Sequence, residues 1–93
     1  MWDFDSNNIS KVKNKTGFYD FYNGNNKRIY VGVAHKLRHR VESYNERDDF
    51  STHPTKQNLR KEIKRFSVHY TKSLRQAQDI EHREKKNCKF NFL

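Results

Sequence analysis

Two tyrosines and an arginine occupy positions in this chain from which they could act together on a phosphate group. Tyr19 closes a Gly-Phe-Tyr triplet, and Tyr30 opens a Tyr-Val-Gly triplet after ten intervening residues. A basic stretch that contains Arg40 follows at residues 37–41. The triplets are typical of the strands of one hairpin and the basic stretch of a helix behind it, so two hydroxyls and a guanidinium could converge. The pattern predicts a surface that handles phosphate.

The hairpin must place the two tyrosines. Residues 18–22 and 28–33 are rich in aromatic and β-branched residues, and they flank an Asn- and Gly-rich segment that favours a turn. Side chains alternate across a strand, so Val31 is predicted to face the core while Tyr30 and Gly32 face the other way. We expect Tyr19 and Tyr30 to share an open face, where Gly32 leaves room for a close approach to the backbone.

The remaining elements follow from periodicity. An apolar stripe predicts a helix over about 34–46, a loop should span 45–53, and Pro54 suits the first position of a second helix. Residues 66–71 alternate as a strand does, and Ser73 is predicted to cap a last helix that runs to about residue 86. The order β-β-α-α-β-α predicts an α+β fold with a small three-stranded antiparallel sheet flanked by helices.

Domain organisation and composition limit the range of possible functions. The 93 residues are enough for one domain, which we place at 17–93, after a polar segment at 1–16 that we expect to be a flexible lead-in. The net charge of +9 favours a polyanionic partner such as nucleic acid, and most of the excess lies after residue 50. With one cysteine, Cys88, and no apolar span or leader pattern, we expect no membrane association and a cytoplasmic protein, nucleoid-associated or nuclear if eukaryotic.

These motifs resemble the GIY-YIG nuclease domain, with 17–19 as the first motif and 30–32 as the second. The stretch 30–44 is especially similar to the version in the N-terminal domain of the bacterial excision-repair incision subunit. Residues 77–81 resemble the glutamate helix of the family, and 89–91 resemble its terminal asparagine motif. The resemblance covers about residues 17–92 and implies a GIY-YIG-like fold.

The resemblance also implies roles for four catalytic residues. Glu81 is the single protein ligand of a divalent cation, Mg²⁺ or Mn²⁺, which prefers hard carboxylate oxygen. Arg40 holds the scissile phosphate and offsets its charge in the transition state. Tyr19 is the general base, a role that needs a lowered phenol pKa, and Tyr30 positions water or phosphate. Without the family, Glu81 is better explained as a surface carboxylate, and the tyrosines are as readily explained as ordinary sheet aromatics.

Further residues are expected to support the site or bind nucleic acid. Supporting residues are Gly32, Asn91, which braces the site through hydrogen bonds, and Tyr44, for which a core position is an equal alternative. The basic residues expected to contact the nucleic-acid backbone are His35, Lys36, Arg38, His39, Arg60, Lys61 and Lys64.

Two departures from the family pattern bear on activity. Val33 stands where the family often has lysine, which removes a cation near the tyrosines unless His35 or Lys36 replaces it. The span from Glu81 to Asn91 is about two residues shorter than usual.

The sequence therefore predicts a divalent-metal-dependent DNA endonuclease that acts as a bare catalytic domain, with DNA repair as its setting. A domain this small should recognise DNA structure, be recruited by a partner protein, or pair with a second copy of itself. The alternative is a non-catalytic basic module that binds nucleic acid and retains only the nuclease fold.

Overall fold

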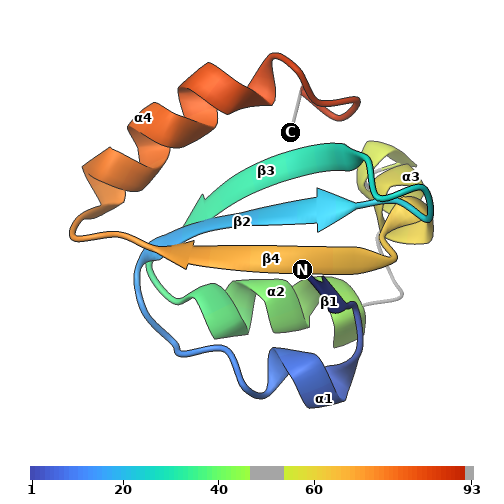
Figure 1. Ribbon diagram of the computed structural model, residues 1–93, viewed down its shortest axis with the longest axis horizontal. Helices are drawn as coiled ribbons and strands as arrows, with labels where there is room; N and C mark the ends of the chain where they lie inside the picture. The colour runs from blue at the N-terminus through green and yellow to red at the C-terminus, as the bar shows by residue number, and fades with distance from the viewer. Residues whose placement is uncertain (47–53, 92–93) are drawn as a thin grey trace.

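The computed structural model describes residues 1–46 and 54–91 and has the expected α+β architecture. The elements in chain order are β1 (Trp2–Asp3), α1 (Ser6–Ile9), β2 (Gly17–Tyr22), β3 (Arg28–Ala34), α2 (Leu37–Glu46), α3 (Pro54–Glu62), β4 (Arg65–Tyr70) and α4 (Leu74–Lys85) (Figure 1). From β2 onward this is the predicted order. No helix in the described ranges has the length and apolar character needed to cross a membrane.

The sheet is antiparallel and has the strand order β1-β4-β2-β3. The predicted hairpin is formed by β2 and β3, with Tyr19 opposite Gly32 and a register shift between Phe21 and Tyr22. In its turn, Asn26 adopts a φ of 60°, a left-handed conformation that asparagine tolerates well. The short strand β1 pairs with β4, so the sheet has four strands where three were expected. In this order β3, which carries Tyr30, is an edge strand.

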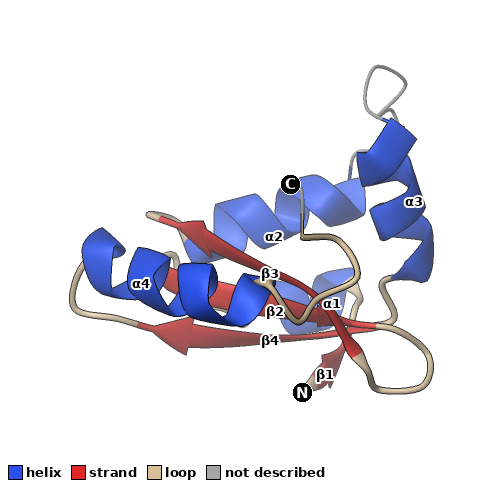
Figure 2. Ribbon diagram, turned by 90° about the horizontal axis from the view of Figure 1, so that it is seen from above, coloured by secondary structure: helices blue, strands red, loops and turns tan. Residues whose placement is uncertain are grey.

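Helices cover both faces of the sheet, which corrects the expectation of an open face. Figures 1 and 2 show the sheet between α2 on one side and α4 on the other. Leu37, Val41 and Tyr44 of α2 are buried, and they belong to the same core cluster as Tyr19 and Tyr30. Alternation along the strands correctly separated the Tyr30 side from the Val31 side. It could not reveal that each side has a helix of its own.

The N-terminal segment, expected to be a flexible lead-in, is a packed part of the fold. Asp5 caps α1 by accepting a hydrogen bond from the N–H of Asn8, at 2.8 Å. Ile9 and Val12 are almost fully buried in the core, while the Phe4 ring packs edge-on against Phe21. The segment is polar overall, but these few apolar side chains fill space beside the sheet and hold it in place.

The last helix begins as predicted. The Ser73 hydroxyl accepts a hydrogen bond from the N–H of Gln76, and the Gln76 side chain accepts one from the N–H of Lys72. After α4 the chain folds back over β3, where the N–H of Phe90 donates to the carbonyl of Ile29 at 3.0 Å (Figure 1). The loop expected at 45–53 lies mostly outside the described residues, and its first two residues belong to α2.

Candidate active site

Three tyrosine side chains from three elements meet beneath one end of the sheet. Tyr19 of β2, Tyr30 of β3 and Tyr44 of α2 have ring centroids 6.0 to 6.4 Å apart. All three are buried, and Tyr44 shares hydrogen bonds with each of the other two. The structure therefore places Tyr44 in the core and in contact with both tyrosines. The sequence left a core position and a supporting polar contact as alternatives, and the structure shows both.

Gly32 has a definite function in this cluster, because the Tyr19 ring lies across it. A Cβ atom at Gly32 would collide with the Cζ and Oη atoms of Tyr19. Gly32 is directly opposite Tyr19 in the sheet, and its φ is not positive, so it is space and not backbone conformation that requires glycine. The sequence indicated a close approach to this backbone. The group that approaches is the chain's own tyrosine.

Burial sets the protonation of Tyr19 and Tyr30. Burial, reinforced by the neighbouring Tyr44 and Tyr30, raises the pKa of Tyr19 well above its ordinary value, and only Arg40 acts in the opposite direction. Burial likewise raises the pKa of Tyr30, with Tyr44 and Glu81 adding to the effect. The lowered phenol pKa expected for Tyr19 is therefore wrong. In the folded protein both phenols are neutral and can donate a hydrogen bond.

Arg40 connects the tyrosines with solvent. Arg40 lies on α2 one turn before Tyr44 and is exposed to solvent. Its positive charge lowers the pKa of the buried Tyr19 hydroxyl, against the effect of burial. The guanidinium is thus close to the cluster and free to meet a ligand from solvent. This is the position that a group binding an anionic substrate needs.

Glu81 lies on α4 and faces an open pocket of about 350 Å³. The pocket is also lined by His82, Lys85, Lys86 and Asn91, so Glu81 and Asn91 come together despite the short span between them. The charge of Glu81 adds to the rise in the pKa of Tyr30, so the carboxylate is close enough to Tyr30 to interact with its hydroxyl. Glu81 and Asn91 thus line an open pocket, and the tyrosines are buried beside it.

Lys85 is a pocket residue that the sequence reasoning missed. Its ammonium lies 5.2 Å from the centre of the Tyr30 ring and 3.7 Å from a carboxylate oxygen of Glu81. It therefore supplies a cation beside the tyrosines, in a chain that has valine at position 33. The signal was present in the sequence, because Lys85 follows Glu81 by four residues and so shares its helix face.

The basic residues predicted to bind nucleic acid lie elsewhere. None of the seven lines the pocket of Glu81. His35, Lys36, His39, Lys61 and Lys64 are exposed, whereas Arg38 pairs with Glu42 at 3.7 Å. Arg60 packs its guanidinium 5.1 Å from the centre of the Phe4 ring, and its Nε atom is buried without a hydrogen-bond partner in the described residues. Arg60 thus helps to hold the N-terminal segment.

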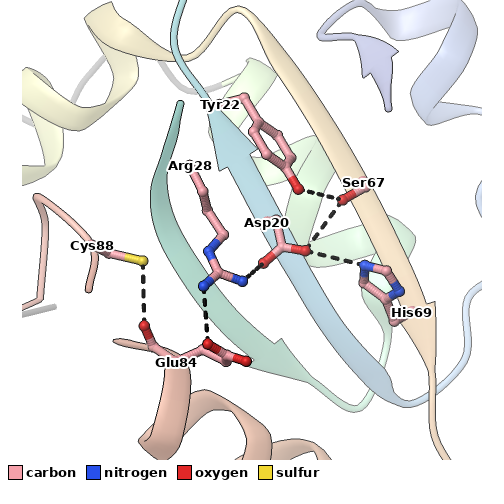
Figure 3. A network of polar contacts seen from close by, with 7 residues as sticks. All are labelled: Asp20, Tyr22, Arg28, Ser67, His69, Glu84 and Cys88. Atoms are coloured by element: carbon pink, nitrogen blue, oxygen red, sulfur yellow. Dashed lines mark hydrogen bonds and ion pairs between the residues drawn. The ribbon is translucent and has the colours of Figure 1, made fainter. Parts of the chain in front are cut away.

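A buried acidic residue on the opposite face of the sheet ties α4 to the strands (Figure 3). Asp20, with a side chain only 3% exposed, lies 3.5 Å from the guanidinium of Arg28, which in turn bonds Glu84 of α4 at 3.1 Å. Ser67 donates to the other Asp20 oxygen, which also contacts His69 at 3.1 Å. Glu84 lies one turn after Glu81, so the network fixes the helix that carries the pocket carboxylate.

The paired tyrosines, the arginine on the following helix and the glutamate on the last helix define a domain of the GIY-YIG nuclease class. Residues 15–92 match the family model of the UvrC-like GIY-YIG domain, and the chain belongs to that family. No curated protein sequence matches the chain.

Solved structures have the same fold. The GIY-YIG N-terminal endonuclease domain of UvrC from Thermotoga maritima, bound to its catalytic divalent cation magnesium, is 23% identical, with a TM-score of 0.72 over 90% of this chain and 91% of that chain. A point mutant of that domain, bound to its catalytic divalent cation, is 22% identical with a TM-score of 0.74 over 94% and 93%. These likenesses establish the fold, including its arrangement of helices around the sheet.

Proposed function

We propose that this protein is a divalent-metal-dependent endonuclease that hydrolyses phosphodiester bonds in DNA, and that the 93-residue chain has this activity by itself. The observation that carries the proposal is the position of Glu81. Its carboxylate faces an open pocket and helps to raise the pKa of Tyr30. Tyr30 belongs to the tyrosine cluster beside Arg40. A carboxylate, phenol donors and a guanidinium in neighbouring positions are groups that phosphodiester hydrolysis can use.

The donor set fits a magnesium ion. Glu81 offers hard oxygen atoms, its side chain is 23% exposed, and the pocket leaves space for water molecules around a cation. Glu81 is the protein ligand that we propose for the ion, and the described residues contain no group of three metal-binding side chains that would offer another site. When bound, the cation would polarise a phosphoryl oxygen and make water more acidic. The related Thermotoga domain binds magnesium as its catalytic cation, which supports this choice.

Arg40, Tyr19 and Tyr30 contact the substrate from the side of the tyrosine cluster. Arg40 holds the phosphate that is cut and offsets the charge that grows on its oxygens. Tyr19 and Tyr30 are neutral phenols, so they orient the phosphate or the attacking water by donating hydrogen bonds. This proposal replaces the role of Tyr19 as a base that is already ionised. Lys85 adds a positive charge next to Tyr30.

Cleavage of DNA by the purified chain tests the proposal. Supercoiled, branched and single-stranded DNA are incubated with Mg²⁺ or Mn²⁺, and nicking is compared between the wild type and Glu81→Ala. We expect nicking to fall by about 10²-fold or more in Glu81→Ala, Arg40→Ala and Tyr19→Phe, while DNA binding in Glu81→Ala and Tyr19→Phe persists. Asp79→Ala is the matched control, because Asp79 is an exposed carboxylate on the same helix.

Two outcomes would contradict the proposal. If the wild type leaves all three DNA forms intact with either metal, the chain is a non-catalytic module that binds nucleic acid. If Glu81→Ala nicks as fast as the wild type, the carboxylate does not hold the cation. The branched DNA also tests whether the domain recognises DNA structure, as repair would require.

A further inference from the structure

A second hollow, of about 430 Å³, lies next to the pocket of Glu81. It is formed where the turn between β2 and β3, the end of α3 and the chain after α4 come together. The polar side chains among its lining residues are Asn23, Lys27, Glu62, Lys86, Asn87 and Lys89. We call it the lysine hollow.

The charges in the lysine hollow favour an anion. Lys89 bonds both oxygens of Glu62, at 2.9 and 2.8 Å, which neutralises the acidic residue of the lining. Within residues 1–46 and 54–91, no carboxylate pairs with the ammonium of Lys27 or Lys86. Two lysines of the lining thus have no carboxylate partner among the described residues, on a chain whose net charge is already +9.

The lysine hollow adjoins the proposed active site, because Lys86 lines both spaces. The chain segment after α4 that lines the hollow is held in place at each end. The N–H of Asn87 donates to the carbonyl of Glu84 at 3.1 Å, and the N–H of Phe90 donates to the carbonyl of Ile29 at 3.0 Å. Because Glu84 lies one turn after Glu81, the position of the hollow is fixed relative to the carboxylate that would hold the metal.

We propose that the lysine hollow binds a backbone phosphate of the DNA strand that is being cut, next to the scissile phosphate. The inference rests on the proposed nuclease function. Lysine ammonium groups and asparagine amides are common donors to DNA phosphates. None of the lining residues is aromatic, so the hollow offers no ring on which a base could stack. The hollow therefore positions the strand without reading its sequence.

DNA binding without turnover tests this inference separately from catalysis. The affinity for a labelled DNA duplex is measured across a salt series in the presence of EDTA. We expect Lys27→Gln/Lys86→Gln to weaken binding by about 10-fold and to reduce the slope of log K against log salt by about one unit for each lost phosphate contact. The control is Lys11→Gln/Lys72→Gln, which removes the same charge from exposed lysines outside both hollows.

Lys27→Gln alone makes the test sharper, because Lys27 lines only the lysine hollow and the hydrogen bond it donates to Asn23 comes from its backbone. We expect this variant to reduce the salt slope by about half as much as the double variant does, and to keep the melting temperature of the wild type. The proposal is overturned if the hollow and control variants weaken binding equally, or if neither does. If the wild type binds through these lysines but cuts no DNA, the nuclease function fails and the phosphate site stands.

Discussion

The aromatic ring of Tyr19 lies against Gly32, where any side chain would collide with its Cζ and hydroxyl oxygen. This contact joins the first motif of the family to the second. It sets the position of the tyrosine hydroxyl relative to Tyr30 and Tyr44, since all three rings pack against one another. The glycine of the second motif is therefore a packing requirement of the tyrosine in the first.

Gly32→Ala should consequently disrupt the site. The added methyl group forces the Tyr19 ring to move, which we expect to destabilise the fold by about 1–3 kcal/mol and to lower DNA cleavage more than DNA binding. Thermal unfolding and cleavage rates measure the two effects. The control is Gly24→Ala, where the new Cβ would meet only a Lys64 side-chain atom at 3.9 Å. Equal effects of the two substitutions would contradict the packing argument.

Alkaline pH should unfold the protein through the buried tyrosines. Burial raises the pKa of Tyr19 and Tyr30 in the folded state, so above pH about 10 the unfolded chain releases protons that the folded protein keeps. The folded state then binds more protons, and stability falls as pH rises, by up to about 1.4 kcal/mol per pH unit for each phenol.

Urea unfolding at several pH values above about 9 measures this loss. We expect Tyr19→Phe and Tyr30→Phe each to make the fall in stability with pH less steep. Tyr70→Phe serves as the comparison, because Tyr70 is 45% exposed. A slope that is unchanged in Tyr19→Phe would show that its phenol ionises in the folded protein, and this would restore the role of a base.

Lys85→Met should slow DNA cleavage. Methionine keeps a long unbranched side chain but removes the charge that lies 3.7 Å from Glu81, and we expect the cleavage rate to fall by about 10²-fold. Single-turnover kinetics with excess enzyme report the chemical step apart from binding. Lys11→Met, at an exposed lysine of the N-terminal segment, should cut as the wild type does. If Lys85→Met also cuts at the wild-type rate, the ammonium has no part in the reaction.

Arg28→Met should destabilise the protein by about 1–3 kcal/mol, because it leaves the buried Asp20 carboxylate without its cation and frees Glu84 of α4. Arg38→Met removes a more exposed ion pair, the one with Glu42, in which both side chains are more than a third exposed. This substitution should change stability by at most about 0.5 kcal/mol. Chemical denaturation compares the two variants. A larger loss in Arg38→Met would refute the importance of the Asp20 network.

The local elements were predictable because their signals are local. The Asn- and Gly-rich turn, the apolar stripe of α2 and the Ser73 cap each depend on residues a few positions apart. β1 was missed because two residues have no period, and its pairing with β4 joins Trp2 to Phe66 across most of the chain. The packing of Ile9 and Val12 was missed for a similar reason, since isolated apolar residues in a polar segment do not reveal what they contact.

The sequence by itself determined the family, the hairpin and the choice of Tyr19, Tyr30, Arg40 and Glu81 as candidate site residues. These depend on the spacing of motifs along the chain, which the sequence gives directly. Only the tertiary structure decided the chemical state of these groups. α2 packs over the tyrosines, so their phenols remain protonated, and the packing of α4 brings Lys85 to the ring of Tyr30. Desolvation and charge proximity depend on which distant elements pack together, and a strand's alternation shows which side a residue faces but not what covers it.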